Sequence, residues 1–235
     1  MVTTAIKIPS RSREAAIPLR PVVDPAVWTA EDLDADKSWI HPLTGEDIAE
    51  LDVVIADFEA RITTVMDIKR GDYELPRLGP KLQAIADDIL EGRGLALIRG
   101  VPVARYSRTQ AAIAFWCIGH YVGDPVSQNS KGHLLGHVAD LGGTTLANPK
   151  NRGYQTHEQL PFHCDSCDVV GLLCLQPAKS GGESTVTSSL NIYNEMLKRR
   201  PDLVAALVEP VYRDRRNEIP KGRDPWFQLP VFNFE

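Results

Sequence analysis

The sequence has little cysteine, no excess of positive charge and no long hydrophobic run, and each shortage excludes a class of protein. Four cysteines in 235 residues are too few for a disulfide framework, which favours a reducing compartment. A formal net charge of -5 at pH 7 gives no electrostatic signature of nucleic-acid binding. No apolar run approaches the roughly 20 residues that span a bilayer, so no membrane partner is expected.

The N-terminal residues also lack the apolar segment of a secretory signal peptide. Before residue 21 they carry a single acid, Glu14, against the basic residues Lys7, Arg11, Arg13 and Arg20. This balance loosely resembles a mitochondrial transit peptide. Their polar, proline-rich composition favours a disordered or extended arm over residues 1–24. We therefore predict a cytoplasmic protein, with a mitochondrial location as the alternative.

Helical signals dominate the first half of the chain and return near its end. Thr44 with Asp47, and Ser107 with Gln110, are spaced as capping boxes that open helices. Apolar periodicity and stop signals place helices at about 45–62, 80–91, 108–121 and 190–199, and a short further helix from Pro201. The chain before the first of these is expected to be pinned to the main body by Trp28 and Trp39.

From Gly123 onward, glycine, asparagine, proline and serine become frequent and short apolar runs recur. These runs are 134–138, 159–163, 168–175 and 185–187. Short strands separated by turn residues predict a jelly roll or barrel. Residues 95–98 are predicted as a buried strand and 226–232 as a late strand, while the basic residues 213–223 suit a solvated loop. We expect an α+β fold in a single domain over residues 25–235, with an N-terminal helical layer and a β-rich core.

The stretch that carries the most chemistry is His163-Cys164-Asp165, just ahead of an apolar run. On a strand, residues i and i+2 point to the same face, so His163 and Asp165 would present an imidazole and a carboxylate to one space. Non-haem Fe(II) oxygenases use two histidines and one carboxylate on one face of the metal. The pair is therefore a candidate for two of the three protein ligands of an iron ion.

An ordered set of motifs surrounds this pair. It consists of Gly94…Arg99-Gly100, Gly123-Asp124-Pro125-Val126, His163-Cys164-Asp165 and Gly181-Gly182-Glu183-Ser184. Over roughly residues 90–235 the chain resembles the taurine dioxygenase/TfdA-like family of Fe(II)- and 2-oxoglutarate-dependent dioxygenases, which are clavaminate synthase-like. The resemblance implies a double-stranded β-helix (jelly-roll) core, an Fe(2+) cofactor and 2-oxoglutarate as co-substrate. It also implies a small-molecule substrate and O2 as partners.

The same resemblance assigns roles to individual residues. His163 and Asp165 match the first two iron ligands, and Ser184 falls where members carry a hydroxyl that contacts 2-oxoglutarate. The third ligand, a late histidine, and the arginine that pairs with 2-oxoglutarate have no counterpart, because His163 is the last histidine. We expect a jelly roll that is incomplete at the C-terminus, in a fragment, a truncated gene model or a degenerate member. The alternative function is a non-catalytic truncated paralogue that acts as a binding or regulatory module.

Several other polar residues are secondary candidates. Tyr154, Gln155 and His157 precede the motif and are predicted to contact substrate. His133 or His137 could supply a third ligand, which would also allow a cupin-like zinc or manganese hydrolase. Cys164 and Cys167 form a C-x-x-C, but without the α/β context of a thioredoxin site or a second pair for zinc. Neither the substrate nor the oligomeric state can be read from the sequence.

Overall fold

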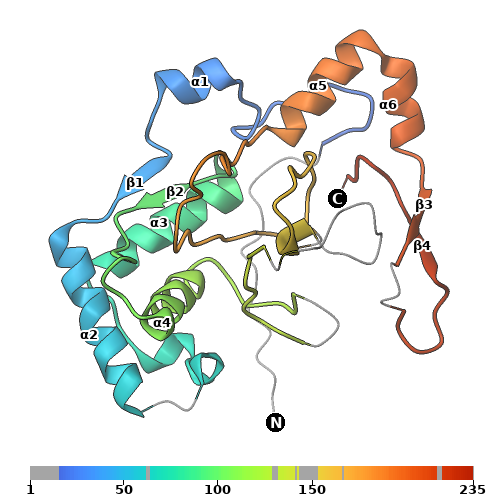
Figure 1. Ribbon diagram of the computed structural model, residues 1–235. Coiled ribbons are helices and arrows are strands. Elements are labelled where there is room, and N and C mark those ends of the chain that lie inside the picture. The colour runs from blue at the N-terminus through green and yellow to red at the C-terminus, as the bar shows by residue number, and fades with distance from the viewer. Residues whose placement is uncertain are drawn as a thin grey trace.

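The computed structural model describes residues 16–61, 64–128, 132–140, 142, 153–165, 167–215 and 219–234. Its elements are α1 Ala30–Ala35, β1 Ile40–Pro42, α2 Gly45–Arg61, η1 Val65–Asp67, η2 Arg70–Asp72, α3 Leu78–Glu91, β2 Leu97–Arg99, α4 Arg108–Gly119, η3 Gly153–Gln155, α5 Ser189–Arg199, α6 Pro201–Leu207, β3 Val211–Asp214 and β4 Trp226–Leu229. Figure 1 shows α2, α3 and α4 gathered on one side and the β3–β4 hairpin on the other. We call residues 30–122 the helical layer and residues 123–234 the C-terminal region.

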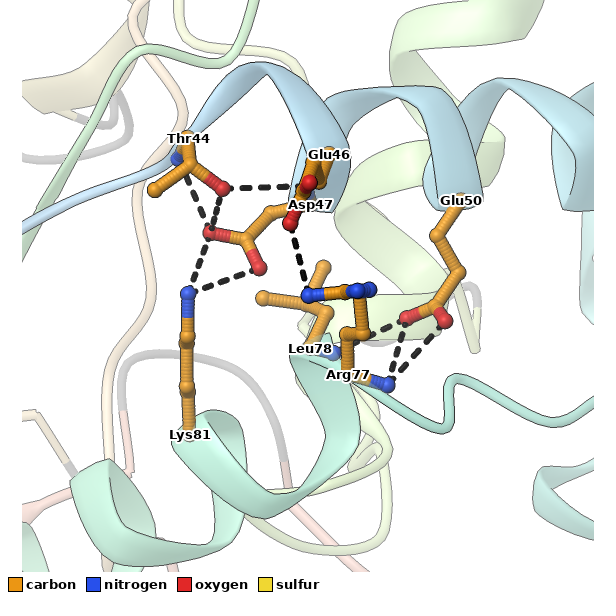
Figure 2. A network of polar contacts seen from close by, with 7 residues as sticks. All are labelled: Thr44, Glu46, Asp47, Glu50, Arg77, Leu78 and Lys81. Atoms are coloured by element: carbon orange, nitrogen blue, oxygen red, sulfur yellow. Dashed lines mark hydrogen bonds and ion pairs between the residues drawn. The ribbon is translucent and has the colours of Figure 1, made fainter.

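Helix α2 begins at the predicted capping box. The Thr44 hydroxyl accepts from the Asp47 backbone N–H at 3.2 Å, and the Asp47 carboxylate accepts from the Thr44 backbone N–H at 2.8 Å. Asp47 is only 1% exposed, and Lys81 of α3 reaches both of its carboxylate oxygens at 2.7 and 2.8 Å (Figure 2). Burial alone would raise the pKa of Asp47, but these hydrogen bonds outweigh it and lower the pKa. A local cap is therefore also a tertiary link.

The start of α3 is capped by a side chain from α2. The Glu50 carboxylate accepts from the backbone N–H groups of Arg77 and Leu78 at 3.0 and 2.9 Å (Figure 2). These are orphan donors at a helix N-terminus, where a negative charge is also favoured by the helix dipole. Arg77 in turn pairs with Glu46 at 2.6 Å. The two helices are thus joined by polar contacts as well as by their apolar faces.

The core of the helical layer lies where α2, α3 and α4 meet the chain between residues 68 and 75. Its buried side chains include Leu51, Phe58, Ile68, Tyr73, Leu78, Leu82, Ile113 and Cys117. Tyr73 donates to the Cys117 carbonyl at 2.7 Å, and the Trp116 indole donates to the Ile68 carbonyl at 3.1 Å. Because these buried polar groups are paired, the loop before α3 is held on α4 without a desolvation penalty.

The predicted helices are confirmed, but the strand at 95–98 is only partly so. It forms β2, which pairs in parallel with β1, with Ile40 opposite Leu97. The burial prediction was wrong, since Leu97 lies exposed at the edge of this two-stranded sheet. A central strand is buried by neighbours on both sides, and this sheet supplies only one.

The C-terminal region corrects the strand predictions more strongly. Within the parts of 134–138, 159–163, 168–175 and 185–187 that the structure describes, no strand forms. The late strand is confirmed as β4, and β3 occupies part of the predicted loop at 213–223, with Val211 opposite Leu229. Apolar runs between turns predict extended backbone, but a strand also needs a hydrogen-bonded partner at the correct register. The family resemblance implies a jelly roll, whereas the described residues form two small sheets.

A second packing centre surrounds α5. Tyr193 is buried and meets the rings of Phe232 and Phe234 edge to face at 5.1 and 5.4 Å. Ser188 is the N-cap of α5, and Pro201 opens α6 as predicted. Residues 1–15 of the predicted arm lie outside the described residues, and the part from Arg20 onward contacts α5. No helix among the described residues is long and apolar enough to cross a membrane.

Candidate metal centre

His163 and Asp165 lie on an exposed, irregular part of the C-terminal region. Their side chains are 52% and 55% exposed, and the His163 Nε2 and Asp165 Oδ1 atoms are 4.0 Å apart. The backbone between them is not in a strand, but the two polar groups still face the same space. Both donors are therefore accessible to an ion from solvent.

The hydrogen bond on the far side of the His163 ring determines its tautomer. Nδ1 lies 2.8 Å from the Pro161 carbonyl oxygen, which can only accept. Nδ1 must then carry the proton, and in the neutral ring the lone pair is on Nε2, the atom that lies 4.0 Å from Asp165 Oδ1. This arrangement is typical of metal-binding histidines, whose second nitrogen donates to a carbonyl or carboxylate.

The distance between the two donor atoms can be compared with the distance between two donors that bind the same metal ion. Donors at about 2.1 Å from a metal and at right angles lie about 3 Å apart. The observed 4.0 Å is about 1 Å longer than this metal-bound spacing, and both side chains are open to solvent. Across the described part of the chain, no group of three or more His, Cys, Asp or Glu side chains is arranged to hold a metal. The pair offers two donors of the types that an iron site uses, and their role as ligands stays a prediction.

Ser184 follows a turn whose shape depends on glycine. Gly181 and Gly182 have φ values of +69° and +77°, in the left-handed region that side chains with a Cβ disfavour. A Cβ on Gly182 would also lie 3.0 Å from the Ala178 side chain. Beyond this turn Ser184 is exposed, on a segment outside helices and strands that leads to Ser188. Its hydroxyl is free to donate to an anion from solvent.

The predicted substrate contacts lie on and after η3. His157 pairs with Asp140 at 3.1 Å, and the pKa of Asp140 is lowered by the Gly142 backbone N–H and by His157. Tyr154 is exposed and accepts from the Ala139 backbone through its carbonyl at 3.0 Å. Sequence reasoning missed Asp140. No spacing rule would have found it, because its partner is 17 positions away along the chain.

The structure also decides between the secondary candidates. Neither His133 nor His137 joins His163 and Asp165 in a group of three ligands within the residues described, which removes the support for a cupin-like hydrolase. The cysteines are free: Cys117 is buried, Cys164 and Cys174 are exposed and Cys167 is half-buried. Burial raises the pKa of the Cys117 thiol to about 12, which makes it an inert core group.

Comparison with known proteins assigns the family. The profile described as "Taurine catabolism dioxygenase TauD, TfdA family" matches residues 58–235, so the chain belongs to this family. The chain is 32% identical over 215 residues to "FR-33289 synthase" of Streptomyces rubellomurinus, covering 92% of this chain and 63% of that protein. It is 31% identical over 192 residues to "Taurine hydroxylase-like protein SAT17" of Stachybotrys chartarum, covering 79% of this chain and 50% of that protein.

The chain thus spans about half to under two thirds of the length of these curated relatives. The matched family profile includes both His163–Asp165 and the Gly181–Ser184 turn. The resemblance noted in the sequence is confirmed at the level of the family. The roles of individual residues stay predictions.

Proposed function

We propose that this chain is the Fe(II)- and 2-oxoglutarate-binding part of a dioxygenase that hydroxylates a small molecule with O2. The observation that carries the proposal is the His163–Asp165 pair, in which Nδ1 of His163 contacts the Pro161 carbonyl and Nε2 lies 4.0 Å from the carboxylate of Asp165. Membership of the TauD, TfdA family supports the same assignment. The printed names of the two relatives, a synthase and a hydroxylase-like protein, are compatible with it.

Each residue has a defined task in this proposal. His163 and Asp165 would hold Fe(II) by one nitrogen and one carboxylate oxygen, and Pro161 keeps the imidazole in the correct tautomer. The Ser184 hydroxyl would donate to a carboxylate of 2-oxoglutarate. The iron and 2-oxoglutarate supply the oxygen chemistry when bound, and the protein supplies ligands and orientation. His157, fixed by Asp140, is proposed to meet the substrate at the mouth of the site.

Anaerobic addition of Fe(II) and 2-oxoglutarate tests the proposal. The readout is the weak visible charge-transfer band that forms when 2-oxoglutarate chelates protein-bound Fe(II). The assay compares the 235-residue chain with a fusion that adds the part of FR-33289 synthase that this chain does not match. We expect the band in the fusion, and its loss in His163→Ala and Asp165→Ala. His137→Ala is the matched control, since it removes another exposed histidine.

The outcomes separate the proposed function from its alternative. Absence of the band in a folded fusion would contradict the assignment of His163 and Asp165 as iron ligands. Decarboxylation of 2-oxoglutarate by the 235-residue chain with added Fe(II) would exclude the non-catalytic alternative for this chain. If the fusion shows the charge-transfer band and the 235-residue chain does not decarboxylate 2-oxoglutarate, the result would support an incomplete set of metal donors in the 235-residue chain.

A further inference from the structure

Residues 20–28, which we call the N-terminal strap, run along the first turns of α5 (Figure 1). The Asn194 side chain accepts from the Val22 backbone N–H and donates to the Val22 carbonyl, both at 2.8 Å. The buried Tyr193 donates to the Arg20 carbonyl at 3.1 Å. One amide side chain therefore satisfies both backbone groups of Val22, as a neighbouring strand would.

The strap also binds the residue at which α5 begins. The Ser188 hydroxyl donates to the Ala26 carbonyl at 2.5 Å and accepts from the Asn191 backbone N–H at 2.9 Å. Ser188 is buried, whereas residues 181–187 before it are exposed. The Ser188 side chain is thus the anchor at which an exposed segment meets the folded α5. Ser184 lies only four positions before this anchor.

The other side of the strap is tied to the helical layer. The Trp28 indole donates to the Arg93 carbonyl at 2.9 Å, just after α3. The Ala26 methyl lies 3.7 Å from where a Cβ of Gly94 would stand. The strap consequently bridges the two regions of the molecule, and it holds Ser188 at a defined place relative to α3.

A cavity of about 390 Å³ separates the segment before Ser188 from the first helix. Its walls include Trp28, Leu33 and Trp39 on one side and Val186 and Thr187 on the other. Val186 is 57% exposed and Thr187 is also exposed, so close side-chain packing does little to hold them against the helical layer. The position of residues 184–187 relative to the helical layer then depends on the hydrogen bonds of the strap and of Ser188.

We infer that the strap orders residues 184–188, and that Asn194 and Ser188 are positioning residues for Ser184. This inference rests on the proposed function only for the identity of the ligand, which is the 2-oxoglutarate carboxylate at Ser184. Without the hydrogen bonds of the strap, the Ser184 hydroxyl would still be present but would occupy a range of positions. Binding of the co-substrate would weaken, while the reaction of bound co-substrate would change less.

Hydrogen exchange and co-substrate kinetics of Asn194→Ala test the inference. The substitution removes both contacts with Val22 and leaves the N-cap of α5 intact. We expect faster amide exchange in residues 20–28 and also in residues 181–188 of the 235-residue chain. In the active fusion we expect the KM for 2-oxoglutarate to rise about threefold to tenfold, with kcat changed less than about twofold.

Two controls separate positioning from a general loss of stability. Glu195→Ala breaks a 2.8 Å surface ion pair with Arg199 on the same helix. It should leave the amide exchange of residues 20–28 and 181–188 unchanged, and also the KM for 2-oxoglutarate. Ser188→Ala should reproduce the effect of Asn194→Ala, and Ser188→Thr, which keeps a hydroxyl, should restore the wild-type exchange and KM. Far-UV circular dichroism checks that each variant is folded.

The exchange data decide the inference whether or not 2-oxoglutarate binds. Faster exchange in residues 20–28 with unchanged exchange in residues 181–188 would overturn it. If both peptides exchange faster in Asn194→Ala and wild type binds no 2-oxoglutarate, the ordering role is supported and the proposed function fails. If residues 20–28 and 181–188 both exchange faster in Asn194→Ala but the KM for 2-oxoglutarate stays constant in the active fusion, the proposed positioning of Ser184 for co-substrate binding is wrong.

Discussion

The helical layer and the C-terminal region are stabilised in different ways. In the helical layer, apolar side chains such as Phe58 and Ile113 are fully buried. In the C-terminal region, Phe162 and Leu172 are 68% and 74% exposed, and most described residues before α5 lie outside helices and strands. A helix satisfies its backbone within one segment, whereas an extended segment needs a partner from elsewhere. The difference shows how strongly the fold depends on whether hydrogen bonds are local.

The largest expected effect comes from truncating one phenylalanine in each region. Phe58→Ala removes a fully buried ring and should lower the free energy of unfolding by about 3–5 kcal/mol. Phe162→Ala removes an exposed ring and should change it by less than about 0.5 kcal/mol. Urea denaturation followed by circular dichroism measures both. Similar losses of unfolding free energy in the two variants would show that Phe162 is buried in solution. They would contradict the contrast between a packed helical layer and an exposed C-terminal region.

Neutralising one aspartate in each region should give a smaller contrast. Asp47→Asn weakens the cap of α2 and the contact with Lys81, and should cost about 1–3 kcal/mol at pH 7. Asp165→Asn should cost less than about 0.5 kcal/mol, because the carboxylate is more than half exposed. Thermal unfolding of both variants beside wild type is the measurement. A larger loss in Asp165→Asn would give that residue a structural role.

The effect of Asp47 should also depend on pH. Its pKa is lowered in the folded protein, so its stabilisation is fully present above the unfolded pKa of about 3.9 and is lost as the pH falls through the folded pKa. The difference in stability between wild type and Asp47→Asn should therefore be constant from pH 7 to about 5 and shrink below about 4. A difference that grows on acidification would contradict a lowered pKa.

The smallest contrast is between two glycines. Gly182→Ala places a Cβ at a φ of +77° and close to Ala178, and should destabilise the protein by about 1–2 kcal/mol. Gly45→Ala, at the first position of α2, meets nothing within 4 Å and should stabilise by less than about 1 kcal/mol. Differential scanning calorimetry resolves both signs. A neutral Gly182→Ala would mean that the turn before Ser184 has no fixed shape.

Helix starts were the part of the fold most open to prediction. The pairs Thr44–Asp47 and Ser107–Gln110 form the expected capping boxes, because each involves residues three apart. The short helix α1 and the strands β1 and β3 were missed. Strand β1 is defined by a partner, β2, that lies 57 positions along the chain, with Ile40 opposite Leu97. No local pattern carries that information.

The candidate site divides in the same way. The proximity of His163 and Asp165 was expected from their spacing of two, but the strand that this expectation assumed does not form. The family membership was expected from the order of the motifs. The contact between Asp140 and His157, the tautomer of His163 set by Pro161 and the bridge from Val22 to Asn194 were not predictable. The Val22 bridge joins residues 172 positions apart, which only a folded chain brings together.

The sequence by itself determined the family and the longer helices, because caps, periodicity and short motifs act over a few positions. Tertiary structure alone decided which groups pair across the chain. It buried Asp47 against Lys81, used Glu50 to cap a helix that begins 28 positions later, and joined the strap to α5. The physical reason is that a hydrogen bond or a buried contact needs both partners at one place, and sequence records only their order.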